Sequence, residues 1–88
     1  MLIRGGQIFS EDQGFTPGDL GISQGQICPP HSAEAGEILD AAGLYVIPGM
    51  IDIHCHGAKG SDFTDASPEA FASIARYELS QGVTSFLG

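Results

Sequence analysis

Apolar and polar residues alternate in short stretches through residues 1–49. Short strands separated by glycine and proline are typical of a small antiparallel β unit. The pattern predicts strands over Leu2–Arg4, Gln7–Ser10, Asp19–Ser23, Gln26–Cys28, Glu37–Leu39 and Leu44–Ile47. The breaks that separate them are Gly5-Gly6, Thr16-Pro17-Gly18, Gln24-Gly25, Pro29-Pro30 and Ala42-Gly43.

Residues 50–88 combine a strand pattern with a helix pattern. Met50–His54 is an apolar and β-branched run, which is typical of a strand buried on both faces in a parallel sheet. Ser67 and Pro68 are the residue types of a helix N-cap and a first helical position. Gly82 is the type that follows a helix end. Between these signals, apolar side chains recur at helical spacing at Phe71, Ile74, Ala75 and Leu79.

Val83–Leu87 is predicted as a second strand, so residues 50–88 should form a βαβ unit with a right-handed crossover. The repeat from Met50 to Gln81 takes 32 residues, and eight such repeats would need about 250 residues, the usual size of a TIM barrel. Two parallel strands and one helix leave both sheet edges open. We therefore expect the chain to be the N-terminal portion of a larger α/β protein, and to be incomplete by itself.

Composition and charge exclude several classes of function. The 88 residues include 3 basic and 11 acidic side chains, for a net charge of −8. Nucleic acids and anionic membranes require clustered cations, whereas Arg4, Lys59 and Arg76 lie far apart. No apolar run approaches the roughly 18–20 residues that span a bilayer, and the start lacks the apolar core of a signal peptide. Cys28 and Cys55 are isolated, which favours reduced thiols and a cytoplasmic location.

His54 and His56 are the strongest candidates for chemistry. Alternation along a strand places them on one face with Asp52, and places the apolar face, Ile51, Ile53 and Cys55, beneath the helix. The imidazoles would then lie at the C-terminal end of the strand, where barrel enzymes have their active sites. Neutral imidazole suits Zn, Fe or Ni, so the pair is predicted to bind a divalent metal. The alternative is a pair of surface histidines without a metal.

Weaker candidates for substrate binding follow the histidine pair. Lys59 has the charge to meet a substrate phosphate, although a solvated loop lysine is the reading that the sequence favours. Backbone N–H groups around Gly57 and Gly60 have the geometry to contact an anion.

Two stretches of the sequence resemble a known family. Pro48–His56 is similar to the first-strand motif of the amidohydrolase superfamily, in which a Pro-Gly-x-Ile-Asp stretch precedes His-x-His. Within that superfamily, His56–Ala66 resembles the N-acetylglucosamine-6-phosphate deacetylases. The resemblance continues through Pro68–Phe71 and Gly82–Leu87, and the opening residues resemble the family's N-terminal β unit.

The resemblance implies a TIM (β/α)8 barrel flanked by a small β-sandwich. Residues 1–49 would be the N-terminal part of the sandwich, and residues 50–88 the first βαβ unit of the barrel. It also implies hydrolysis of the N-acetyl group of an amino-sugar phosphate, with release of acetate. Members that keep both histidines can hold two metal ions, and His54 and His56 would bind the more exposed one.

The resemblance also implies which parts of the enzyme are missing. The remaining ligands and the catalytic aspartate belong to later strands, so no residue of this chain is predicted to be catalytic and the chain alone is expected to be inactive. In the full-length protein we expect one or two divalent ions, with Zn or Fe favoured. We also expect the full-length protein to be a homo-oligomer. If the 88 residues are all that is made, their open strand edges would favour self-association.

Two alternatives remain open. One keeps amidohydrolase chemistry but changes the substrate to a cyclic amide, such as a hydantoin or dihydroorotate. The other is a non-catalytic, truncated and self-associating fragment whose histidines bind metal loosely.

Overall fold

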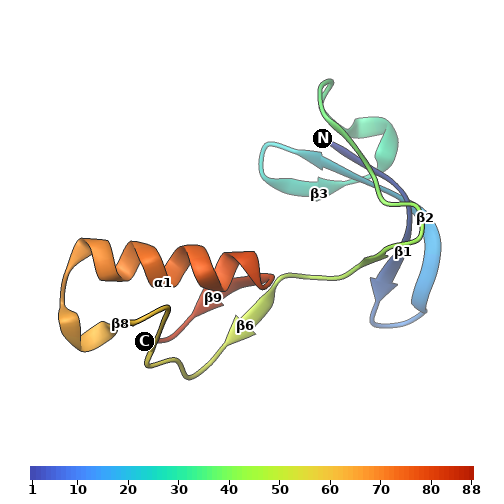
Figure 1. Ribbon diagram of the computed structural model, residues 1–88. Coiled ribbons are helices and arrows are strands. Elements are labelled where there is room, and N and C mark those ends of the chain that lie inside the picture. Colours follow the sequence, from blue (N-terminus) through green and yellow to red (C-terminus); the bar gives the residue numbers. More distant parts are fainter. The chain divides into compact units, whose positions relative to one another are not determined.

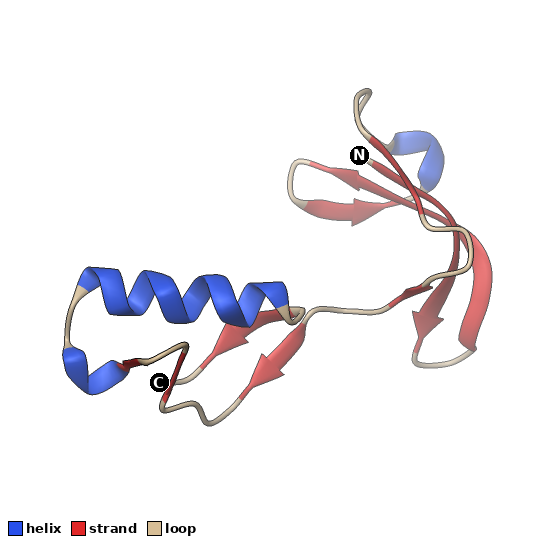
Figure 2. Cartoon of the chain, viewed as in Figure 1, coloured by secondary structure: helices blue, strands red, loops and turns tan.

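A computed structural model describes residues 1–88, which divide into two units, Met1–Pro48 and Gly49–Gly88 (Figure 1). Strands make up most of the first unit, whereas a long helix accompanies the strands of the second (Figure 2). The chain is therefore a mixed α/β structure. None of its helices has the length and apolar character needed to cross a membrane.

The first unit contains one mixed sheet in the order β3-β2-β1-β4, with β5 also paired to β1. Strands β1, β2 and β3 are antiparallel neighbours, but β4 and β5 both run parallel to β1. The prediction of a purely antiparallel unit is therefore wrong. The elements are β1 (Leu2–Ser10), β2 (Gly14–Ser23), β3 (Gln26–Cys28), the 3₁₀ turn η1 (Pro30–Ser32), β4 (Ile38–Asp40) and β5 (Tyr45–Val46).

Two predicted breaks lie inside strands. At Gly5 the strand β1 continues through a β-bulge, because glycine adopts the positive φ of +75° that the extra residue requires. Its N–H donates to Asp19 Oδ1 at 2.9 Å. Pro17 is paired with Gln7 within β2. Because β3 pairs with β2 only from Gly21 onward, Pro17 lies on a sheet edge, where a missing N–H is tolerated.

The second unit contains a parallel strand pair joined by a helix. Strand β6 (Met50–Asp52) pairs in parallel with β9 (Val83–Phe86), and helix α1 (Pro68–Ser80) connects them. Between β6 and α1 lie the antiparallel hairpin of β7 (Gly57–Ala58) and β8 (Ser61–Asp62), and the 3₁₀ turn η2 (Phe63–Asp65). The predicted strand–helix–strand order is confirmed, although β6 ends two residues earlier than expected.

Helix α1 begins where the sequence indicates. Ser67 has an extended backbone, and its Oγ accepts the N–H of Ala70 at 3.1 Å, while Pro68 occupies the first helical turn. Gly82 follows the helix with a φ of +85°. Both caps therefore match their predicted roles.

The buried face of α1 differs from the predicted apolar stripe. Ala70, Ile74 and Glu78, spaced four residues apart, are buried, and Ile74 is fully enclosed. Phe71 and Leu79 are instead 55% and 66% exposed. The prediction placed the stripe about one residue off around the helix, because it counted only apolar residues and a carboxylate occupies the third buried position.

Candidate metal centre

The two histidines lie just after β6, in the segment that leads from that strand to the β7–β8 hairpin. Two backbone hydrogen bonds hold this segment, one at the residue between the histidines and one at His56. The Cys55 N–H donates to the Leu87 carbonyl at 3.1 Å, and the Phe63 N–H donates to the His56 carbonyl at 3.1 Å. The imidazoles thus project from a short connection that is tied to the residue after β9 and to the chain before α1.

The imidazole rings of His54 and His56 converge. Their Nε2 atoms are 3.0 Å apart, and their ring planes stand at 89° with centroids 4.7 Å apart. Both side chains are exposed. If one Nε2 carries a proton, this contact is a hydrogen bond between two neutral imidazoles. If neither Nε2 carries a proton, both nitrogens have a lone pair available for the same metal ion.

The distance between these nitrogens fits a shared ion. Two imidazole nitrogens bound at about 2.0–2.1 Å to one metal lie about 2.8–3.4 Å apart for ligand angles from about 90° to tetrahedral. The observed 3.0 Å lies within that range. Exposure of both rings leaves other coordination positions accessible to water or further ligands. The chemistry of the donor pair therefore fits the divalent metal predicted at His54 and His56.

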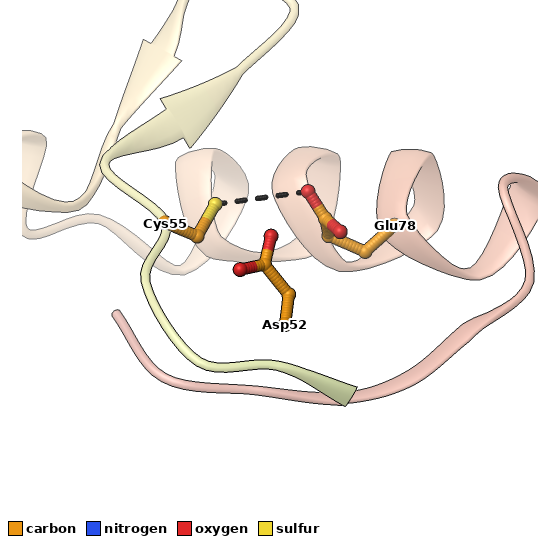
Figure 3. Close-up of side chains that lie close together, drawn as sticks. All are labelled: Asp52, Cys55 and Glu78. Carbon is orange, nitrogen blue, oxygen red and sulfur yellow. Dashed lines mark hydrogen bonds between the residues drawn. The ribbon is translucent and has the colours of Figure 1, made fainter. Parts of the chain in front are cut away.

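Asp52 does not share a face with the two imidazoles, contrary to the strand prediction. Its carboxylate groups with the Cys55 thiol and the Glu78 carboxylate, with one ligand atom of each within 4.8 Å of the others (Figure 3). Ile51 and Ile53, expected beneath the helix, are 69% and 77% exposed. Within β6 it is therefore Asp52, and not Ile51, that faces α1. Beyond Asp52 the two-residue alternation is broken by a turn in which the Asp52 side chain accepts the His54 N–H at 3.0 Å.

Cys55 and Glu78 form a polar contact between the histidine segment and α1. The Cys55 thiol donates to Glu78 Oε1 at 3.6 Å, and Glu78 is only 7% exposed. Burial raises the pKa of the Cys55 thiol, and the carboxylates of Glu78 and Asp52 raise it further. The thiol therefore stays protonated and able to donate. Sequence reasoning missed Glu78, although its position four residues after Ile74 is the signal that marks it.

The weaker candidates occupy the β7–β8 turn. Gly57 has a φ of +156°, and a Cβ there would overlap the Ser61 carbonyl oxygen. Lys59 has a φ of +53°, and its Nζ lies 5.3 Å from the centroid of the Tyr77 ring, a cation–π contact with α1. Gly60 has open space around its Cα. A substrate contact from Gly57, Lys59 or Gly60 stays a prediction.

The acidic residues that follow the hairpin have a structural role. Asp62 Oδ1 accepts both the N–H and the hydroxyl of Thr64 at 2.8 Å, and these bonds lower the pKa of Asp62. In return the Asp62 N–H donates to Asp65 Oδ2 at 2.9 Å. This reciprocal cap fixes η2. A pocket of about 420 Å³ adjoins it, and neither histidine lines that pocket.

No family model matches the chain, but curated proteins and a solved structure are similar to it. It is 35% identical over 92 residues to the N-acetylglucosamine-6-phosphate deacetylase of Bacillus subtilis, covering 99% of this chain and 23% of that protein. It is also 35% identical over 89 residues to the D-hydantoinase of Rhizobium radiobacter, covering 99% of this chain and 19% of that protein.

A solved structure of an N-acetylglucosamine-6-phosphate deacetylase is also similar to this chain. The crystal structure of the N-acetylglucosamine-6-phosphate deacetylase from Thermotoga maritima matches with a TM-score of 0.78 and 28% identity, over 100% of this chain and 22% of that one. The chain thus spans about a fifth of the length of the relatives it matches. The resemblance that the motifs indicated is confirmed over nearly all of its residues.

Proposed function

We propose that this chain, as a relative of the N-acetylglucosamine-6-phosphate deacetylases, is the N-terminal part of a metal-dependent enzyme that removes the N-acetyl group from an amino-sugar phosphate. In this proposal β6, α1 and β9 are the first βαβ unit of a TIM barrel, and residues 1–49 belong to a small β-sandwich. The similarity to deacetylases over the whole chain and the parallel pairing of β6 with β9 support it.

One observation carries the proposal: the Nε2 atoms of His54 and His56 converge to 3.0 Å at the C-terminal end of a parallel strand. These two residues would hold a divalent metal, with Zn or Fe as the favoured ion. Such an ion polarises an amide carbonyl and lowers the pKa of water towards 7. In the proposed barrel, this chain contributes the imidazoles of His54 and His56 as two neutral ligands at an exposed position.

Proton transfer to the departing amine needs a general acid whose pKa lies near the working pH. We assign that role to a carboxyl group of the full-length enzyme outside these residues. Asp52 and Glu78 are turned toward each other and Cys55. The β7–β8 turn, with Gly57, Lys59 and Gly60, is the part of this chain that we propose nearest to the substrate phosphate.

Zinc titration tests the metal assignment. In the natural gene product, of which this chain is proposed to be the N-terminal part, the NMR signals of both imidazole rings should shift together as Zn²⁺ is added. His54→Ala and His56→Ala should each weaken binding by about 10-fold or more, because one imidazole holds the ion less tightly than two. His31→Ala is the matched control, since His31 is an exposed histidine in the other unit, and should change nothing. Equal losses in all three variants would refute the assignment.

A second candidate function is hydrolysis of a cyclic amide, because D-hydantoinases match as fully as the deacetylases do. The two reactions share the metal chemistry and differ in product. Deacetylation releases acetate, whereas hydantoin hydrolysis opens a ring and releases no second molecule. Offering both substrates to the natural gene product distinguishes them.

A further inference from the structure

We propose that Asp52 is a positioning residue for the metal centre, acting through the backbone of His54. Its carboxylate holds the His54 N–H, and thereby fixes the direction in which the His54 imidazole leaves the chain. This inference rests on the proposed function, since it gives Asp52 its role only if His54 and His56 bind a metal.

The Asp52 carboxylate is the hydrogen-bond acceptor of the His54 N–H. Strand pairing stops at Asp52, and beyond it the sheet is continued only by the Leu87 N–H donating to the Asp52 carbonyl and the Cys55 N–H donating to the Leu87 carbonyl. The His54 N–H joins neither of these bonds and donates to Asp52 Oδ1 at 3.0 Å. Without that acceptor, no hydrogen bond would fix the His54 peptide unit.

The Asp52 carboxylate lies on the side of the strands that faces the helix. Asp52 pairs with Phe86 on β9, and the Phe86 ring lies 6.0 Å from that of Phe71 on α1, so this face of the strands is turned toward the helix. There the carboxylate is half-buried beside the Cys55–Glu78 hydrogen bond (Figure 3). The segment is thus tied at His54 to the end of β6 and at Cys55 to α1.

This arrangement has a consequence for metal affinity. If the His54 peptide is free to rotate, metal binding must order it, and that entropy cost is subtracted from the binding free energy. Groups that orient metal ligands typically change affinity by about 10–100-fold when they are removed. For a contact to the backbone rather than to the ring, we expect the lower end of that range.

The chain contains a matched control for the test. Asp40 makes the same turn in the other unit, where its Oδ1 accepts the Ala42 N–H at 3.0 Å. Asp52→Ala and Asp40→Ala therefore remove equivalent hydrogen bonds, and only the first lies beside the histidines. Asp52→Asn keeps an oxygen that accepts the His54 N–H but removes the charge. All three variants are made in the natural gene product, and their Zn²⁺ affinity is measured by the imidazole NMR titration, with urea unfolding as the check on stability.

The expected result is a loss of Zn²⁺ affinity of about 10-fold in Asp52→Ala, with unchanged affinity in Asp40→Ala and in Asp52→Asn. Unchanged affinity in Asp52→Ala, while the unsubstituted natural gene product binds Zn²⁺, overturns the inference and leaves the proposed function standing. An equal loss in Asp52→Asn also overturns it, since charge rather than the hydrogen bond would then be responsible. A natural gene product that binds no Zn²⁺ refutes the proposed metal centre and this role with it.

Discussion

The segment from Asp52 to Gly57 owes its shape to the residues at its two ends. Asp52 ends the strand by accepting the His54 N–H, and Gly57 begins the hairpin at a φ that other residues rarely adopt. Between them His54 and His56 project from the same side of a short turn, so that their Nε2 atoms meet. The candidate metal pair is therefore a product of its flanking residues as well as of its own spacing.

Gly57→Ala tests how tightly the hairpin is built. The new Cβ would overlap the Ser61 carbonyl oxygen and also require an unfavourable φ, so we expect unfolding free energy to fall by about 2–4 kcal/mol. Gly60→Ala is the control, because its φ is also positive but nothing lies within 4 Å of the added atom. It should cost about 1 kcal/mol. Urea unfolding measures both, and equal costs would show that the close approach at Gly57 is relieved by movement of β8.

At the scale of elements, the helix was more predictable than the strands. Ser67, Pro68 and Gly82 act locally, so their residue types alone locate both ends of α1. Strand ends depend on partners distant in sequence. Gly5 and Pro17 look like breaks, yet a bulge in β1 and an edge position in β2 accommodate them.

The candidate site was also only partly predictable from the sequence, because some of its contacts join residues that are distant in the chain. The spacing of His54 and His56 identifies the pair, and the structure brings their rings together. Strict alternation then fails at Asp52, because its side chain bonds within its own turn. Glu78 escaped prediction because burial of a carboxylate on α1 depends on the Cys55 thiol, which lies 23 residues earlier in the chain.

Ile74→Ala tests which face of α1 is buried. Ile74 is fully enclosed, so truncation should lower the unfolding free energy of the second unit by about 2–5 kcal/mol. Leu79→Ala, at a side chain 66% exposed, should change it by no more than about 0.5 kcal/mol. Both are measured by urea unfolding followed by circular dichroism. A larger loss of unfolding free energy in Leu79→Ala than in Ile74→Ala would show that the apolar stripe predicted from the sequence is the buried face.

At the scale of the molecule, the second unit leaves one face of its strands uncovered. α1 packs against the side that carries Phe86, whereas Ile51 and Ile53 are largely exposed. Large apolar side chains in such positions require a covering partner in the working protein. The proposed barrel supplies one, because its interior is filled by side chains from all of its strands. This feature supports the proposed barrel, and the greater length of the relatives leaves room for its further strands.

The most direct test of the proposed function is the release of acetate from N-acetylglucosamine-6-phosphate by the Zn²⁺-loaded natural gene product, with a hydantoin offered in parallel. We expect acetate release, and no ring opening of the hydantoin. Ring opening without acetate would assign the chain to a cyclic-amide hydrolase and contradict the proposed substrate. If a folded, metal-loaded protein catalyses neither reaction, the proposal that this chain is part of an amidohydrolase is contradicted.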